Sequence, residues 1–79
     1  MKLTYDPKYN IGYIQFREKG ADVETIRVSD ELNIDLAPDG AIYGIELLNA
    51  REQLAGDKVK KFIMENASTG KTCELELPL

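Results

Sequence analysis

Apolar and polar residues alternate with a period of two over most of the chain, a pattern typical of β-strands. It predicts strands over residues 3–5, 11–18, 23–29, 32–36, 41–48 and 72–77. The alternation is cleanest in 32–36, where Leu32, Ile34 and Leu36 share one face and the residues between them are polar. A strand with one apolar and one polar face belongs to an antiparallel sheet that exposes one side to water.

Turn-forming residues separate these predicted strands. Asp6-Pro7 ends the first strand, because proline lacks the N–H group that a strand ladder needs. Residues 19–21 form a further predicted turn, and Pro38-Asp39-Gly40 predicts a tight hairpin with glycine at a positive φ. Gly44 interrupts the fifth strand, which indicates a bulge or a close approach of another group to the backbone.

The pattern changes to helical spacing between residues 50 and 66. Asn49 followed by Glu52 predicts a capping box at a helix start, and Gly56 is expected to end that helix. Asp57 is a candidate N-cap for a second helix. Its apolar stripe would consist of Val59, Phe62, Ile63 and Ala67. The pattern leaves open whether residues 50–66 form one helix or two.

These elements predict an α+β fold in one small domain that spans residues 1–79. An antiparallel β-meander of about five strands comes first, then a short helical segment that packs on one sheet face, then a final strand. Cys73 shares the apolar face of that last strand, so we expect it in the core.

A chain of 79 residues buries little surface, and a lone cysteine cannot close an intrachain disulfide. One short helix leaves part of the apolar sheet face and a sheet edge uncovered. We therefore expect a homo-oligomer, most simply a dimer, in which a second copy covers them.

Composition excludes several classes of chemistry. The chain has no histidine and one cysteine, so it offers no Ser-His-Asp triad, no Cys-His dyad and no structural zinc site. We expect no enzymatic activity, no cofactor and no metal centre. The net charge of −4 disfavours nucleic acid as a partner, because the phosphate backbone attracts basic surfaces.

Membranes are not expected as partners either, because no apolar run approaches the roughly 20 residues that a membrane span requires. The first residues also lack the apolar region of a signal peptide. With one free cysteine and no export signal, the expected location is the cytoplasm.

Several motifs follow one another in unbroken order through residues 2–51. They are Tyr5-Asp6-Pro7, Tyr13-Ile14, Glu24-Thr25, Val28-Ser29-Asp30, Asn33-Ile34-Asp35-Leu36, Asp39-Gly40 and Gly44-Ile45-Glu46-Leu47-Leu48-Asn49-Ala50. Together they resemble a family of small prokaryotic proteins catalogued as domain of unknown function 2283, and the last motif is the most specific. Residues 52–79, the helix and last strand, lie outside the usual core of that family.

The resemblance implies a small β-meander domain from a bacterium or an archaeon, and no assigned activity. Some relatives are encoded beside small toxin-like proteins, which implies an antitoxin-like or partner role. A small basic protein would suit this acidic chain electrostatically.

Three acidic residues within the family-like motifs are candidate ligand-binding residues: Asp6, Asp35 and Glu46. Paired carboxylates bind hard cations or share a proton. The simpler interpretation is that Asp6 caps its own turn, Asp35 lies on a wet sheet face and Glu46 forms an ion pair. Two functions stay open. The preferred one is a non-enzymatic homodimeric interaction module, and the alternative is a domain that binds a small ligand or a divalent metal through these carboxylates.

Overall fold

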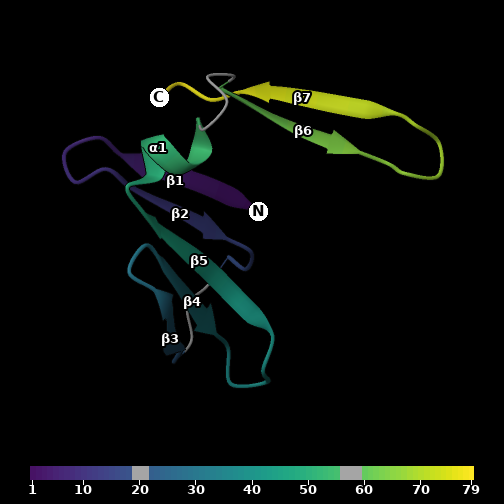
Figure 1. Ribbon diagram of the computed structural model, residues 1–79. Coiled ribbons are helices and arrows are strands. Elements are labelled where there is room, and N and C mark those ends of the chain that lie inside the picture. Colours follow the sequence, from purple (N-terminus) through teal and green to yellow (C-terminus); the bar gives the residue numbers. More distant parts are fainter. Residues whose placement is uncertain (19–21, 56–59) are drawn as a thin grey trace.

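Figure 1 shows the computed structural model, which describes residues 1–18, 22–55 and 60–79. The strands are β1 (Lys2–Asp6), β2 (Ile11–Gln15), β3 (Glu24–Ser29), β4 (Leu32–Leu36), β5 (Ile42–Leu48), β6 (Lys61–Glu65) and β7 (Thr72–Glu76), and the helix is α1 (Ala50–Leu54). The turn predicted at residues 19–21 lies outside the described residues, as do the predicted helix end at Gly56, the candidate cap Asp57 and Val59 of the predicted stripe.

The first five strands form one antiparallel sheet with the order β1-β2-β5-β4-β3. The predicted α+β class, with an antiparallel five-stranded sheet, a short helix and a later strand, is confirmed. The order departs from a sequential meander at one point, because β2 pairs with β5 and not with β3. The longest strand, β5, thereby takes the centre of the sheet and the fully exposed strand β3 takes an edge.

The two faces of this sheet differ in character. Directly paired residues align one apolar row across all five strands, which consists of Leu3, Ile14, Ile45, Ile34 and Ile26. The neighbouring row points to the opposite side and consists of Thr4, Tyr13, Glu46, Asn33 and Arg27. We call these sides the apolar face and the polar face. The alternation in the sequence is the direct cause of the difference, because successive strand residues point to opposite sides.

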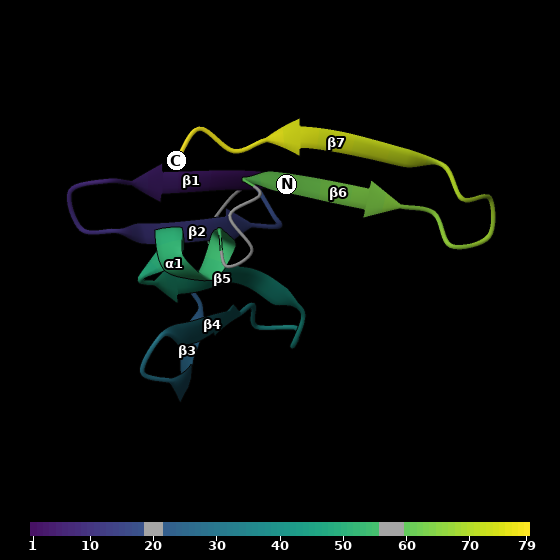
Figure 2. The same cartoon turned by 45° about the horizontal axis from the view of Figure 1, so that its top comes forward.

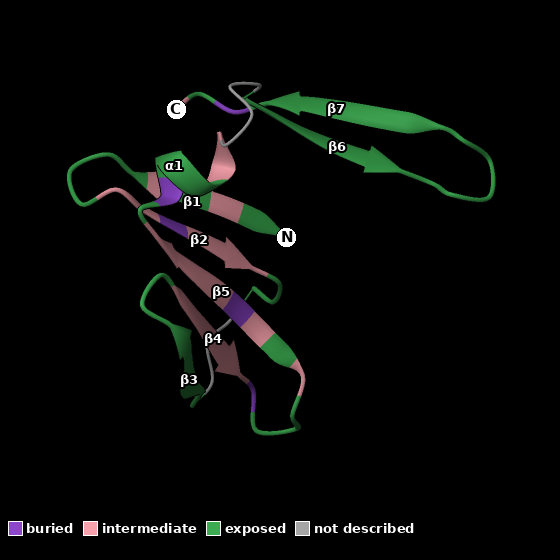
Figure 3. Ribbon diagram, in the orientation of Figure 1, coloured by how far each residue is buried: buried purple, intermediate pink, exposed green. Residues whose placement is uncertain are grey.

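Helix α1 covers one part of the apolar face. Ala50 is fully buried and lies over Gly12 of β2. A Cβ atom at Gly12 would come within 3.1 Å of the Ala50 Cβ and 3.8 Å of a Leu54 methyl group, so the glycine lets the helix lie close to the sheet. Because α1 has only five residues, it leaves the apolar face toward β4 and β3 open, and there β4 is half-buried and β3 is exposed (Figure 3).

Strands β6 and β7 form a separate two-stranded hairpin. The predicted last strand is confirmed as β7, but the helix predicted to include Phe62 and Ile63 is wrong, because Lys61–Glu65 is a strand. The turn between the strands explains the difference. Asn66 accepts a hydrogen bond at Oδ1 from the Ser68 N–H at 3.0 Å, and Gly70 has a φ of 73°. Such residues favour a hairpin over a continuing helix.

The exposure of the hairpin also corrects the expectation for Cys73. This cysteine is exposed and not in the core, since the hairpin projects beyond the sheet and no other described layer covers it (Figure 2).

Few residues in the described part of the chain are fully buried. The buried apolar residues there are Ala37, Ala50 and Leu77, none of which fills a large core.

The molecule exposes more surface than a globular chain of its size. Its accessible area is 6103 Å², whereas a folded protein of 8.9 kDa is expected to expose about 4,800 Å². Its radius of gyration is 14.0 Å, against about 11.6 Å expected for 79 residues. The exposed edge strand β3 and the projecting β6–β7 hairpin both contribute to this larger surface.

Candidate functional site

A hydrogen-bonded cluster on the polar face connects strands β2, β4 and β3. The Tyr13 hydroxyl donates to Asp35 Oδ2 at 2.7 Å, and Thr25 Oγ1 donates to Asp35 Oδ1 at 2.6 Å. To reach Asp35, the Tyr13 ring crosses β5 directly over Gly44, where a Cβ atom would lie 2.6 Å from the ring Cε2. The close approach predicted at Gly44 is therefore confirmed, and its cause is this aromatic ring.

Glu46 is the second carboxylate of the polar face. It lies between Tyr13 on β2 and Asn33 on β4, and it accepts a hydrogen bond from Asn33 Nδ2 at 2.8 Å. Asp35 pairs with Gly44, so Glu46 is its diagonal neighbour, at a typical Cα separation of about 7–8 Å. The two carboxylates thus have different neutral donors, two for Asp35 and one for Glu46.

Asp6 lies apart from the other two candidates. It ends β1, three strands away from β4 in the sheet, and its Oδ1 accepts a hydrogen bond from the Lys8 N–H at 2.9 Å. The structure therefore places Asp35 and Glu46 on one face and leaves Asp6 at the end of the edge strand β1. Within residues 1–18, 22–55 and 60–79, no cluster of three or more His, Cys, Asp or Glu side chains is arranged to hold a metal ion.

Tyr13 is held in its neutral form. Burial raises its pKa well above the ordinary value of 10.0, and the hydrogen bond to the Asp35 carboxylate and the negative charge of that group raise it further. A phenol with a raised pKa is a hydrogen-bond donor at neutral pH and a poor base or nucleophile. The chemistry that this cluster supports is the cross-linking of three strands through one carboxylate.

Asn10, which is not among the residues predicted from the sequence, connects the β1–β2 turn to α1. Its Oδ1 accepts hydrogen bonds from the Tyr5 hydroxyl at 3.0 Å and from the Arg51 N–H at 2.9 Å. Its Nδ2 donates to Glu52 Oε2 at 2.7 Å, and its carbonyl oxygen accepts from the Ala50 N–H at 3.0 Å. The signal in the sequence was an asparagine in a turn, since asparagine adopts the positive φ of 55° found here more readily than most residues.

The capping box predicted at the start of α1 is wrong in its details. Asn49 occupies the N-cap position but makes no side-chain capping bond, and it has a left-handed backbone conformation. Glu52 is hydrogen bonded to Asn10 and not to the Asn49 backbone. Two N–H groups of the first helical turn, those of Ala50 and Arg51, are instead satisfied from outside the helix by the carbonyl and side-chain oxygens of Asn10.

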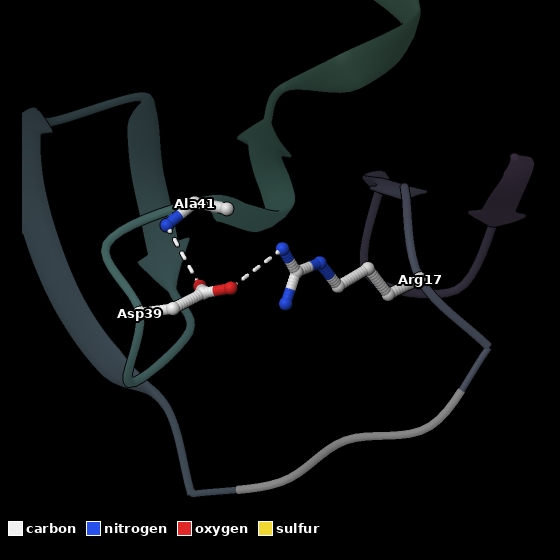
Figure 4. Close-up of polar contacts among 3 residues, drawn as sticks. All are labelled: Arg17, Asp39 and Ala41. Atoms are coloured by element: carbon white, nitrogen blue, oxygen red, sulfur yellow. Dashed lines mark hydrogen bonds and ion pairs between the residues drawn. The ribbon is translucent and has the colours of Figure 1, made fainter.

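A second polar contact lies at the opposite end of the sheet (Figure 4). Asp39 of the β4–β5 turn accepts hydrogen bonds from the Ala41 N–H at 3.0 Å and from Arg17 Nη2 at 3.1 Å. Arg17 lies just after the end of β2, so this ion pair connects the end of β2 with the β4–β5 turn. Gly40 has a φ of 85° and donates its N–H to the Ala37 carbonyl, so the predicted Pro38-Asp39-Gly40 turn is confirmed.

The ionisation of Asp39 makes the stability of the fold depend on pH. The Ala41 N–H, followed by the Arg17 guanidinium, lowers the pKa of its carboxyl below the ordinary value of 3.8. A pKa that is lower in the folded state contributes stability above the unfolded value, and this is lost as the pH falls through the folded value. We expect Asp39→Asn to lower the melting temperature at pH 6, and we expect this difference to shrink as the pH falls below 3.8 and the wild-type carboxyl becomes protonated. Thermal unfolding followed by circular dichroism between pH 2 and 7 checks this, and a pH-independent difference would contradict it.

A protein-family model described as "Protein of unknown function (DUF2283)" matches residues 2–51, more than half of the chain. The chain belongs to this family. The resemblance inferred from the motifs is thereby confirmed, and the DUF2283 match includes strands β1 to β5 and the first two residues of α1. No curated protein and no solved structure matches the chain.

The family match covers only one part of the structure. The polar-face cluster and Asn10 lie inside the DUF2283 region, whereas the β6–β7 hairpin lies outside it. In the described part of the chain, no helix has the length and apolar character needed to cross a membrane.

Proposed function

We propose that this DUF2283 protein is a non-enzymatic protein-interaction module that functions as a homodimer. The observation that carries the proposal is the open part of the apolar face. Ile45, Ile34 and Ile26 continue the apolar row away from α1, and Ile26 is 42% exposed. Ile34 and Ile45 are half-buried, so the apolar surface left in water increases toward Ile26 at the sheet edge. Each Å² of apolar surface that stays in water is unfavourable by about 25 cal/mol.

The size of the exposed surface agrees with a dimer. The accessible area exceeds the expectation for a globular chain of this mass by about 1,300 Å². A standard protein–protein interface removes about 800 Å² from each partner. One specific contact with a second copy would therefore bring the exposed area of each protomer close to that of an ordinary folded protein.

The polar face supports a structural role in preference to catalysis. Both Asp35 oxygens accept hydrogen bonds from neighbouring strands, and Glu46 is bonded to Asn33. Tyr13 stays protonated at neutral pH, so it supplies neither a base nor a nucleophile. These contacts stiffen the sheet, and a rigid sheet presents its other face to a partner with little loss of conformational entropy on binding.

The dimer is also proposed to bind a small basic protein, in an antitoxin-like role. The net charge of −4 supports this part of the proposal, since opposite charge accelerates encounter and sets specificity. Purification from the native cell at about 50 mM salt is expected to retain a small basic protein that about 500 mM salt releases, because screening weakens such contacts. Recovery of the homodimer alone at low salt would contradict the basic partner and leave the dimer standing.

The homodimer is tested at Ile26, which lies at the accessible edge of the apolar face. We expect Ile26→Ser to raise the dimer dissociation constant by roughly 10- to 100-fold, the equivalent of the ~1.5–3 kcal/mol gained by burying an isoleucine. Sedimentation equilibrium over a range of protein concentrations measures this constant.

Arg27→Ser is the matched control, because Arg27 follows Ile26 in β3 and points to the polar face. It removes only the exposed ion pair with Asp30, which contributes little to stability, so the dissociation constant should stay within threefold of the wild type. A wild-type protein that stays monomeric at all concentrations, or equal effects of the two substitutions, would contradict the proposal.

A further inference from the structure

The β6–β7 hairpin carries a second apolar surface. Phe62 pairs directly with Leu75, and Met64 pairs with Cys73, so these four side chains share one face of the hairpin. We call this the hairpin apolar surface. All four residues are exposed, and Phe62 is 51% accessible to solvent.

The opposite face of the hairpin is mostly charged. It carries the residues that alternate with the apolar four, which are Lys61, Ile63, Glu65, Thr72, Glu74 and Glu76. Lys61 and Glu74 form an ion pair at 3.5 Å on this side. The hairpin is therefore amphipathic, with one side suited to contact with another apolar surface and one side suited to water.

Nothing described in the same chain covers the hairpin apolar surface. The hairpin projects beyond the edge of the five-stranded sheet, and its two strands pack chiefly against each other (Figure 2). A two-stranded hairpin without further packing is marginally stable in water. A further apolar surface packed on the hairpin would therefore stabilise its five-pair ladder.

We propose that the hairpin is an exchanged arm, whose apolar surface packs on the open apolar face of a second copy of this chain. The inference rests on the proposed homodimer and names the surfaces that form it. Each protomer has one uncovered apolar hairpin surface and one apolar sheet face that is partly open. In a dimer with two-fold symmetry, each hairpin would cover the open sheet face of the other protomer, so both kinds of surface would be buried together. Such an isologous arrangement closes the assembly at two chains.

The dimensions of the two surfaces agree. Five residues of strand extend over about 17 Å, whereas the part of the apolar face that α1 leaves open, from β5 to β3, is about 10 Å wide. The hairpin of one protomer is therefore long enough to span the open part of its partner's sheet. It would rest there as a second layer about 10 Å above the sheet, with its charged side in water.

The test compares two neighbouring residues of β6 in the full-length chain. Phe62 and Ile63 are almost equally exposed, at 51% and 53%, but they point to opposite sides of the hairpin. Phe62→Ser is expected to raise the dimer dissociation constant by about 10- to 100-fold, and Ile63→Ser by less than threefold. Sedimentation equilibrium measures both, and circular dichroism verifies that each variant keeps its strands.

Cys73 provides a second readout that requires no change to the hairpin. As the single cysteine of the chain and a member of the hairpin apolar surface, it should react with a thiol reagent about tenfold more slowly when the protein is dimeric. Ile26→Ser, which alters the sheet and not the hairpin, should restore fast reaction at the same protein concentration.

The outcomes separate this inference from the proposed function. If the wild type dimerises but Phe62→Ser and Ile63→Ser behave alike, the exchanged arm is wrong and the homodimer stands. If Phe62→Ser exposes Cys73 while Ile26→Ser leaves it protected, the hairpin packs elsewhere than on the sheet, and the inference is again overturned. A wild-type protein that stays monomeric would contradict both the homodimer and the exchanged arm.

Discussion

Replacement of Asn10 by alanine is expected to lower the free energy of unfolding by about 2–4 kcal/mol. The side chain makes three hydrogen bonds, to Tyr5, Arg51 and Glu52, and each contributes about 1 kcal/mol on average. Alanine at a φ of 55° adds a penalty of roughly 1 kcal/mol, because its Cβ crowds the following carbonyl. Urea unfolding followed by circular dichroism measures the change.

Two further substitutions separate these contributions. Asn10→Gly keeps the positive φ and loses the side-chain hydrogen bonds, so it should cost about 1 kcal/mol less than Asn10→Ala. Asn10→Asp keeps an acceptor for Tyr5 and Arg51 but places a negative charge against Glu52. Its destabilisation should therefore shrink as the pH falls and the carboxyl groups become protonated. A cost below 0.5 kcal/mol for all three variants would show that α1 does not depend on this residue.

Substitution of Gly44 by alanine is expected to cost about 1–3 kcal/mol, the usual range for inserting a methyl group into occupied space. The new Cβ would lie 2.6 Å from Cε2 of the Tyr13 ring, so the ring must move away from the sheet. The movement would also break the hydrogen bond from Tyr13 to Asp35, now 2.7 Å long. Urea unfolding gives the free energy, and the ultraviolet absorption of tyrosine reports the change around the ring.

A double-mutant cycle identifies the ring as the cause. In a Tyr13→Ala background, Gly44→Ala should be neutral or slightly stabilising, because no ring opposes the methyl group and alanine suits a strand better than glycine. The resulting coupling energy should be about 1–3 kcal/mol. An equal cost in both backgrounds would place the strain in the backbone of β5 and contradict the contact with Tyr13.

Local patterns were sufficient to predict the five strands of the main sheet. Each has a period of two, and the turn at Pro38-Asp39-Gly40 has residues that require one backbone geometry. The pattern predicts a helix through Phe62 and Ile63, whereas Lys61–Glu65 is a strand, because these two apolar residues fit a helical stripe as well as the two faces of a strand. The turn residues after Glu65 decide in favour of the strand, since they return the chain to pair with β7.

The cluster on the polar face was predictable only in part. Asp35 and Glu46 stand in the family-like motifs, and both prove to accept hydrogen bonds from side chains of neighbouring strands. Their contacts depend on the pairing of β2 with β5, and pairing between strands distant in sequence leaves no local signature. For the same reason the Tyr13-Ile14 motif does not identify Tyr13 as the donor to Asp35.

The strand order has a consequence for how the chain reaches its folded state. The β1–β2 hairpin and the β3-β4-β5 meander are each made of neighbours in sequence, so each can form early with little loss of chain entropy. The pairing of Ile14 with Ile45 joins these two halves across about thirty residues. Folding should therefore be governed by the rate at which β2 finds β5, and not by the growth of any single turn.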